Sequence, residues 1–302
     1  MSDQATQLRE LMLSMGIQSK ALPSDVEKPD LKIIAVASGK GGVGKSNYAV
    51  NLAIALAQQN HKPILLDADF GFANVEILLG QKPKHILSEM LKDHTLELKD
   101  LLTPTDYQVS FISGGSAVKD MMFLNENQID QISRKLKDIE NEGDILIIDI
   151  GAGMSDIAIK FSLLADEIHV VVIPEPTSKV DAYAFIKTLF LEFKKDLRIK
   201  LIVNKARYEK EALDVYETIS SVCDLQLDKK LYYGGYIPRD RNIEESAYKQ
   251  IPVMMYAPKS ISSQAFTRIS KSLVDEFFVQ EQENKPKESL FNKFKNILAF
   301  KK

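Results

Sequence analysis

The amino-acid sequence predicts an α/β protein with a doubly wound, mostly parallel sheet that is flanked by helices. Short apolar runs rich in Ile, Leu and Val recur between residues 31 and 280, and segments of helical character alternate with them. Several of these runs end in glycine or aspartate, residues that occur where the strands of an open sheet meet a ligand. With 302 residues, the chain is long enough to bury the core of such a fold, in one domain or in two.

The first expected strand, residues 33–37, leads into a glycine-rich loop and then into an apolar helix over residues 48–57. The loop has the spacing G-x-x-x-x-G-K-[ST], which is typical of a phosphate-binding loop. Glycines allow backbone N–H groups to point at phosphate oxygens, Lys45 is expected to reach the β- and γ-phosphates, and Ser46 offers a hydroxyl to Mg²⁺. The residues expected to contact ATP are Gly39, Lys40, Gly41, Gly42, Val43, Gly44, Lys45, Ser46 and Asn47.

Two further expected strands end in carboxylates. One ends in Asp67, with Asp69 two positions later, and the other ends in Asp149. Because the carboxyl ends of parallel strands meet at one edge of a sheet, these side chains are expected to face Mg²⁺ and an attacking water. Asp149 is expected to hold a water on Mg²⁺ beside Ser46, and Gly153 to let the backbone approach the γ-phosphate.

Later strand ends are expected to form a pocket for the nucleotide base. The amide of Asn204, near the end of one apolar run, can donate to and accept from the edge of an adenine. The residues expected at this pocket are Asn204, Lys205, Pro238, Arg239 and Asp240. The elements expected after the phosphate loop are strands over residues 63–67, 109–112, 144–149, 168–173, 201–205 and 236–240 and helices over residues 75–79, 86–91 and 127–139.

The composition narrows the chemistry. The chain has one cysteine, Cys223, which excludes a disulfide framework or a two-cysteine metal site within one chain and fits a reducing cytoplasm. The four histidines lie far apart in the sequence, so no zinc cluster is expected. The sequence has no apolar span of 18 residues and no secretory signal. Six lysines against one glutamate in residues 285–302 leave the rest of the chain acidic, which speaks against non-specific DNA binding.

Segments at both ends are expected to act outside an ATPase domain over residues 31–280. Residues 1–16 are expected to form a short helix, followed by a linker over residues 17–30. Residues 281–302 are expected to form a basic linker and an amphipathic helix that binds anionic membrane lipid. The apolar stripe of this helix comprises Leu290, Phe291, Phe294, Ile297 and Leu298. The alternative for each segment is that it packs back on the core.

The string KGGVGKS, with a second lysine at Lys40, resembles the deviant Walker A box of the MinD/ParA family of dimerising ATPases. Residues 67–74, DADFGFAN, resemble the family's DADxGxAN box. The resemblance covers about residues 31–275 and implies a slow, Mg²⁺-dependent ATPase that forms a homodimer with ATP. It implies that Lys40 crosses to the phosphates bound by a second copy and acts in catalysis with Lys45, while Asp69 orients the attacking water.

The same resemblance implies the roles of the remaining site residues. Asp67 is implied as an outer-shell partner of Mg²⁺, in addition to Ser46 and Asp149. The dimer interface is implied to contain Lys40, Asn74 and Gly153. The family usually has Thr or Ser after the aspartate of the Walker B segment, whereas this chain has Ile150, so the fine geometry of the site stays open.

Within this family, the sequence is similar to the FlhG (FleN) group of flagellar-number regulators. Asp3-Gln4-Ala5-x-x-Leu8-Arg9 resembles the DQAxxLR element of that group, and the runs IDIGAG, PEPTSKVDAYA and IPRDRNIEESA are also similar. The resemblance implies that these N-terminal residues bind and stimulate the flagellar GTPase FlhF. It also implies a flagellar transcription regulator or switch-complex protein as a partner, no sequence-specific nucleic acid, and reversible binding to the cytoplasmic face of the inner membrane, including the cell pole.

Four other interpretations stay open on the sequence. A division-site MinD would share the chemistry but lack the N-terminal element, and a ParA-type partitioning ATPase would need a basic surface for DNA. An iron–sulfur carrier or nitrogenase-type reductase would need cysteines at its interface. A non-hydrolysing regulatory protein would keep its regulatory output after the replacement of Asp69.

Overall fold

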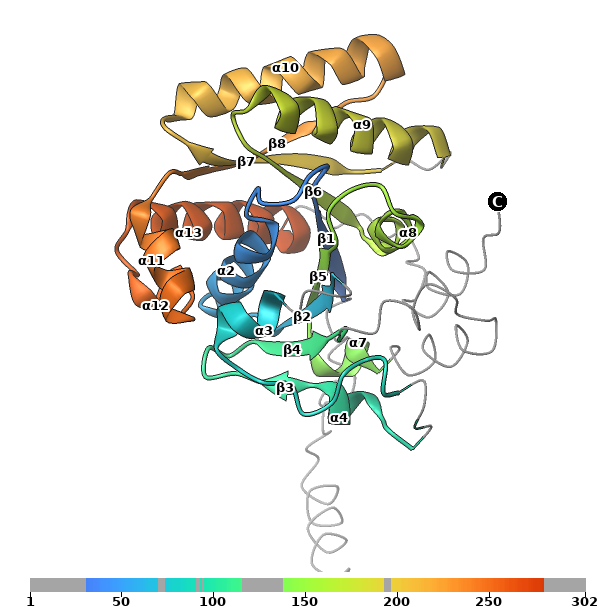
Figure 1. The fold of residues 1–302 in the computed structure, drawn as a ribbon, viewed down its shortest axis with the longest axis vertical. Coiled ribbons are helices and arrows are strands. Elements are labelled where there is room, and N and C mark those ends of the chain that lie inside the picture. Colours follow the sequence, from blue (N-terminus) through green and yellow to red (C-terminus); the bar gives the residue numbers. More distant parts are fainter. Residues whose placement is uncertain are drawn as a thin grey trace, which may run out of the picture. The chain divides into compact units, whose positions relative to one another are not determined.

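The structure, a computed structural model, describes residues 31–69, 74–90, 93, 95–115, 138–192 and 197–279. An eight-stranded sheet with the order β3-β4-β2-β5-β1-β6-β7-β8 forms their centre (Figure 1). Neighbouring strands run parallel, except β3 and β4, which are antiparallel, so the predicted mostly parallel sheet is confirmed. The strands are β1 (Lys32–Ala37), β2 (Pro63–Ala68), β3 (Thr103–Pro104), β4 (Ser110–Ser113), β5 (Ile145–Ile150), β6 (Glu167–Val172), β7 (Ile199–Ala206) and β8 (Tyr232–Pro238).

Helices cover both faces of the sheet (Figure 1). One layer contains α8 (Asp156–Leu164), α9 (Pro176–Glu192) and α10 (Glu209–Leu227). The other contains α2 (Lys45–Ala57) and α13 (Ile261–Val274), which pack against each other. The shorter helices are α3 (Asn74–Leu79), α4 (Leu98–Leu101), α7 (Ile139–Glu142), α11 (Arg241–Lys249) and α12 (Val253–Tyr256), and a π-helix, η1 (Asp275–Val279), continues α13.

Burial on both faces explains the continuous apolar runs of the sequence. In β1, Ile33, Ala35 and Ala37 belong to the core under one helix layer, and Ile34 and Val36 belong to the core under the other. Successive side chains of a strand point to opposite faces, so a strand between two helix layers needs apolar residues at nearly every position.

The strand register gathers the predicted acidic residues at one edge of the sheet. Asp67 of β2 lies opposite Asp149 of β5, and Asp149 lies opposite Val36 of β1. Because β5 lies between β1 and β2, the loop that follows β1 and the two carboxylates are neighbours along this edge. The fold therefore places the predicted nucleotide residues at the carboxyl ends of the central strands.

Most of the expected elements are confirmed, with shifted ends. The last expected strand, 236–240, begins four residues earlier in the structure, at Tyr232, and ends at Pro238. The prediction of a helix over residues 86–91 is wrong, because Ile86 forms a bridge with Ser113 and a turn follows. The predicted helix over residues 127–139 falls almost wholly outside the described residues.

In the part of the chain that the structure describes, no helix has both the length and the apolar character needed to span a bilayer. Residues 1–30 and 280–302 lie outside the described residues. The predicted roles of the two terminal segments therefore stay predictions, as do the expected domain limits.

Candidate functional site

Glycines determine the shape of the phosphate loop, which joins β1 to α2. Gly42 and Gly44 have φ angles of 78° and 90°, in the left-handed region that favours glycine. At Gly39, a Cβ atom would lie 2.2 Å from the backbone carbonyl of Asp181 in α9, so the loop can approach this helix only with glycine there. The loop leads directly into α2, whose first residue is Lys45.

Two cavities open beside the loop and share Gly44 and Asn47. The smaller, of about 320 Å³, is lined by Ser38, residues 40–47, Asp69, Asn74, Ile77, Leu78, Ala152 and Ala247. The larger, of about 520 Å³, is lined by Gly44, Asn47, Ile173, Pro174, Glu175, Asn204, Lys205, Arg207, Glu211, Pro238, Arg239, Asp240, Ile243 and Glu244. This layout suits a nucleotide with its phosphates on the loop and its base in the larger cavity.

Lys45 forms ion pairs with two of the predicted carboxylates. Its Nζ atom lies 2.7 Å from Oδ1 of Asp149 and 3.6 Å from Oδ2 of Asp69. Lys45 is buried and Asp149 has no exposed surface. Burial raises the pKa of Asp149, and the ion pair with Lys45 opposes this shift. The lysine expected to bind phosphate thus neutralises the chain's own acidic groups here.

Asp67 is a buried carboxylate in an unfavourable environment. Burial, and then the negative charge of Asp149, raise its pKa to about 7. Its oxygens accept hydrogen bonds from the backbone N–H groups of Asp69, at 3.0 Å, and Val75, at 3.3 Å, which oppose the shift. Asp67 therefore holds the start of α3 and stands next to the acidic cluster, compatible with the predicted outer-shell role.

These groups fit a magnesium ion that arrives with a nucleotide. Mg²⁺ in such sites is held by one or two carboxylates or a hydroxyl together with phosphate oxygens and waters, not by a full cage of side chains. Within the described ranges, no three His, Cys, Asp or Glu residues could hold a metal ion by themselves, which agrees with that arrangement. The buried Oδ2 atom of Asp149 has no hydrogen-bond partner among the described residues, and Ser46 offers its hydroxyl in the first turn of α2.

Lys40 is bound by its own chain in this structure. Its Nζ atom donates to Oε2 of Glu175, at 3.0 Å, and to Oγ1 of Thr177, at 3.2 Å. The side chain is partly exposed, at 31%, on the wall of the smaller cavity. The sequence reasoning missed Glu175 and Thr177 as its partners. No signal in the sequence links these residues to Lys40, because Glu175 lies 135 positions away from it.

Asn204 and Lys205 hold the phosphate loop from the side of the base cavity. The amide Nδ2 of Asn204 donates to the carbonyl of Val43 at 2.7 Å, and Nζ of Lys205 donates to the carbonyl of Gly42 at 3.0 Å. Oδ1 of Asn204 accepts from the backbone N–H of Lys205 at 2.9 Å. The amide is therefore engaged with the loop and its own backbone, and its expected role as the reader of an adenine edge stays a prediction.

Pro238, Arg239 and Asp240 line the larger cavity, and their contact with a nucleotide stays a prediction. The carboxylate of Asp240 has a structural task, because it caps α11 by accepting from the N–H of Asn242 and also accepts from the hydroxyl of Ser262 at 2.7 Å. Burial would raise its pKa, but these hydrogen bonds outweigh burial and lower it. Arg207, Glu211 and Glu244 are cavity residues that the sequence reasoning missed.

The two predicted interface residues other than Lys40 also lie at the site. Nδ2 of Asn74 donates to Oδ2 of Asp69 at 3.3 Å. The N–H of Gly153, which has a φ of 92°, donates to the carbonyl of Ser38 at 3.0 Å. The predicted partner residues Asp3, Gln4, Ala5, Leu8 and Arg9 and the predicted membrane residues Leu290, Phe291, Phe294, Ile297 and Leu298 lie outside the described residues.

Comparison with protein families gives a match over residues 31–274 to the model described as ParA, NUBPL iron-transfer P-loop NTPase. Antiactivator FleN of Pseudomonas aeruginosa is 36% identical over 243 residues, which are 80% of this chain and 86% of FleN. The flagellum site-determining protein YlxH of Helicobacter pylori is 29% identical over 307 residues, 99% of both chains.

Among solved structures, the septum site-determining protein MinD of Pyrococcus horikoshii, complexed with Mg-ADP, has the same fold. The TM-score is 0.67 at 24% identity, and the match covers 84% of this chain and all of that one. At this identity, the likeness is one of fold.

Cys223 does not offer a ligand for an iron–sulfur cluster. It is the only cysteine of the sequence, and it is fully buried in α10. Burial raises the pKa of its thiol to about 11. Because an iron–sulfur cluster is held by several cysteine ligands, one buried cysteine does not supply the iron chemistry in the description of the matched family model.

Proposed function

The chain belongs to the ParA family of P-loop NTPases, and from this premise we propose that it is a Mg²⁺-dependent ATPase that dimerises with ATP and regulates flagellar number and placement. The matched family model spans residues 31–274, and the loop, the acidic cluster and both cavities lie within that range. FleN and YlxH, whose names refer to antiactivation and to the site of the flagellum, are the relatives that support the flagellar role.

The dimer proposal rests on the ion pairs that each of the two loop lysines forms with carboxylates of its own chain. Lys45 is held by Asp149 and Asp69, and Lys40 is held by Glu175 at the wall of the phosphate cavity. A triphosphate offers Lys45 a stronger anionic partner and leaves Asp149 free for the metal. Lys40 is partly exposed, so it can exchange Glu175 for the phosphates of a second copy.

In the proposed reaction, Lys45 binds the β- and γ-phosphates and Asp69 orients the attacking water. Asp69 lines the smaller cavity, and Asn74 and Lys45 hold one of its carboxylate oxygens. Mg²⁺, when bound, neutralises charge on the phosphates. Lys40 from the second copy adds positive charge where negative charge grows in the transition state, as an arginine finger does. Cleavage of the γ-phosphate removes the anion that joins the copies, so the dimer dissociates.

In the proposed cycle, the C-terminal segment binds the membrane and the N-terminal element acts on FlhF. ATP-driven dimerisation pairs two copies of the amphipathic segment 289–298, and two weak lipid-binding segments on one particle bind far more tightly than one. The N-terminal element 3–9 stimulates the GTPase FlhF. Deletion of residues 2–16 tests this last step, since it should abolish FlhF stimulation and leave ATP hydrolysis intact.

The experiment that tests the proposed function is the measurement of molecular mass in solution with Mg-ADP and with Mg-ATP. The wild type should be monomeric with ADP and dimeric with ATP. Asp69→Ala should form long-lived dimers with ATP, because water is no longer oriented, and Lys40→Ala should form no productive dimer. A wild type that binds ATP and stays monomeric at every protein concentration would reject the dimer switch.

A further inference from the structure

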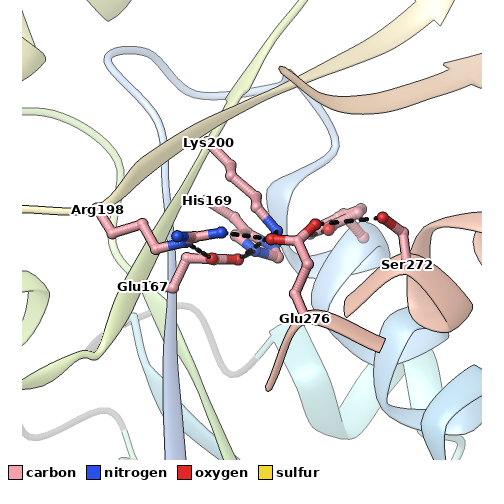
Figure 2. A network of polar contacts seen from close by, with 7 residues as sticks. Glu167, His169, Arg198, Lys200, Ser272 and Glu276 are labelled. Carbon is pink, nitrogen blue, oxygen red and sulfur yellow. Dashed lines mark hydrogen bonds and ion pairs between the residues drawn. The ribbon is translucent and has the colours of Figure 1, made fainter. Parts of the chain in front are cut away.

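Figure 2 shows a network of charged side chains around Glu167. Glu167 lies at the amino end of β6, whereas the phosphate loop follows the carboxyl end of the neighbouring strand β1. Glu167, the first residue of β6, has no exposed surface, and its carboxylate contacts Nε of Arg198 at 2.7 Å and Nζ of Lys200 at 3.1 Å. Both bases also contact Glu276, with 2.9 Å between its Oε2 and Nζ of Lys200. The two acids and the two bases together carry no net charge. The hydroxyl of Ser272 donates to Oε1 of Glu276 at 3.3 Å.

A buried histidine connects this network to the helix of the phosphate loop. His169 has no exposed surface; its Nε2 lies 2.6 Å from Oε1 of Glu167, and its Nδ1 lies 2.8 Å from the hydroxyl of Tyr48. Hydrogen bonds and charges from His169, Lys200 and Arg198 outweigh burial and lower the pKa of Glu167 to about 2, so this carboxylate is an acceptor. Nε2–H of His169 therefore donates to this carboxylate, and Nδ1 shares a hydrogen bond with the hydroxyl of Tyr48.

Tyr48 lies in the first turn of α2, three residues after Lys45 and two after Ser46. Its ring is buried against Phe266 of α13, with 6.1 Å between the ring centroids. The hydrogen bond to His169 therefore fixes the turn that carries the phosphate-binding lysine and the metal-binding hydroxyl.

The contacts from Tyr48 through His169, Glu167 and Lys200 to Glu276 form a continuous column. Glu276, at its end, lies in the π-helix η1, where the chain leaves α13. The next residue, Phe277, is buried under Nζ of Lys32, which is 5.3 Å from the centroid of its ring. Single π-turns often occur at functional positions. In the sequence, the expected linker begins at residue 281 and the expected amphipathic segment 289–298 follows it.

We propose that Tyr48 is a positioning residue for the nucleotide site. The column Tyr48–His169–Glu167 then links the positions of Lys45 and Ser46 to that of Glu276, which Lys200 and Arg198 hold just before the C-terminal segment. Nucleotide binding and the ordering of residues 272–279 then favour each other, because a coupling between two sites is reciprocal. This inference rests on the proposed function, since it concerns the same nucleotide site.

The test uses the full chain with a slowly hydrolysed ATP analogue and Mg²⁺, so that hydrolysis is not needed. Tyr48→Phe keeps the ring and removes the hydroxyl, and it should weaken nucleotide binding about threefold to tenfold, the usual effect of one buried hydrogen bond. Glu276→Gln changes a residue that lines neither cavity, and it should weaken binding about twofold to fivefold. The double variant should be weaker than the wild type by less than the product of the two effects.

Hydrogen exchange of residues 272–279 supplies a readout that a purely structural role would not change. Nucleotide should slow exchange there in the wild type and should have no effect in Tyr48→Phe, at a temperature where both are fully folded. Tyr256→Phe is the matched control, because its hydroxyl donates to Glu245 at 3.2 Å, outside the column, and it should bind and exchange like the wild type.

The outcomes separate the two proposals. If the wild type binds the analogue and both variants bind it equally well, with unchanged nucleotide-dependent exchange, the inference is wrong and the proposed function stands. If the wild type binds no nucleotide at all, the proposed function fails, and the inference fails with it.

Discussion

Buried acidic residues lie at the carboxyl ends of the parallel strands, here called the carboxyl edge of the sheet, and at their amino ends, the amino edge. The two groups differ in how many hydrogen-bond and ion-pair partners their carboxylates have. At the carboxyl edge, Asp67 and Asp149 lie opposite each other, the pKa of Asp67 is raised to about 7, and one oxygen of Asp149 has no partner among the described residues. At the amino edge, Glu167 contacts His169, Arg198 and Lys200, and its pKa is lowered to about 2.

This difference supports the proposal that the carboxyl edge binds the ligand. A buried acid whose oxygens all have partners stabilises the folded chain. A buried acid that lacks partners is available to bind a cation that is not part of the chain. Lys45 partly fills that role at the carboxyl edge, and a nucleotide with Mg²⁺ would release it. Four changes to the chain or its solution test this contrast, in order of decreasing effect.

Removal of the charge at the amino edge should have the largest effect on stability. Glu167→Gln leaves Lys200 buried with only Glu276 as an acidic partner, and it should lower the free energy of unfolding by about 3 kcal/mol. Urea unfolding without nucleotide measures this change. An effect below about 1 kcal/mol would mean that the partners of Glu167 do not stabilise the folded chain as their contacts indicate.

Ligand binding should stabilise the chain through contacts at the carboxyl edge. Mg²⁺ with an ATP analogue at a hundred times its dissociation constant should raise the free energy of unfolding by about 2.7 kcal/mol. Lys45→Ala should abolish this gain, because the triphosphate loses its main cationic contact. Thermal unfolding with and without ligand tests both statements, and an equal gain in the variant would contradict the assignment of Lys45.

The two edges should respond to pH with opposite signs in the absence of ligand. The pKa of Glu167 is lowered, so its stabilisation is present above pH of about 4.5 and is lost as the pH falls towards 2. The pKa of Asp67 is raised, so the folded state holds a proton that the unfolded state releases, and stability declines as the pH rises from about 4 to 7.

Asp67→Asn should remove this decline and stabilise the ligand-free chain at pH 8 by about 1–2 kcal/mol. Urea unfolding of both proteins from pH 4 to 8 is the measurement. A parallel decline in the variant would show that another group causes it.

The smallest effect is expected at the rim of the amino-edge network. The hydroxyl of Ser272 donates to Glu276 at 3.3 Å and is exposed to solvent, so Ser272→Ala should change the free energy of unfolding by less than about 0.5 kcal/mol. The same urea series that measures Glu167→Gln measures this variant. A loss of stability as large as that caused by Glu167→Gln would mean that the network depends on the hydrogen bond from Ser272.

Local patterns predicted the fold well, and they named the residues that the structure gathers at the loop after β1. The strands of the central sheet are buried on both faces, so their composition alone reveals them, as in β1 and β5. The loop glycines, Lys45 and the acids at the strand ends follow from backbone geometry and from the parallel register. Each of these features is local in sequence or follows from a rule about sheets.

The features that sequence missed depend on contacts between distant segments. The pairing of Lys40 with Glu175 joins positions 135 residues apart, and the bond between Asn204 and Val43 joins positions 161 residues apart. The column from Tyr48 to Glu276 likewise depends on packing between α2, β6, β7 and η1. No periodicity or spacing rule predicts these contacts, since each depends on how two distant segments of the chain pack together.

Complementation between two variants tests whether Lys40 contacts a phosphate that is bound by another copy. Lys40→Ala should bind ATP but lack the charge supplied across the interface, and Lys45→Ala should keep Lys40 but bind ATP poorly, so each alone should be inactive. A mixture of the two should regain ATP hydrolysis, because Lys40 of one copy completes the site of the other. A mixture as inactive as its components, under conditions where the wild type hydrolyses ATP and both variants are folded, would contradict the account.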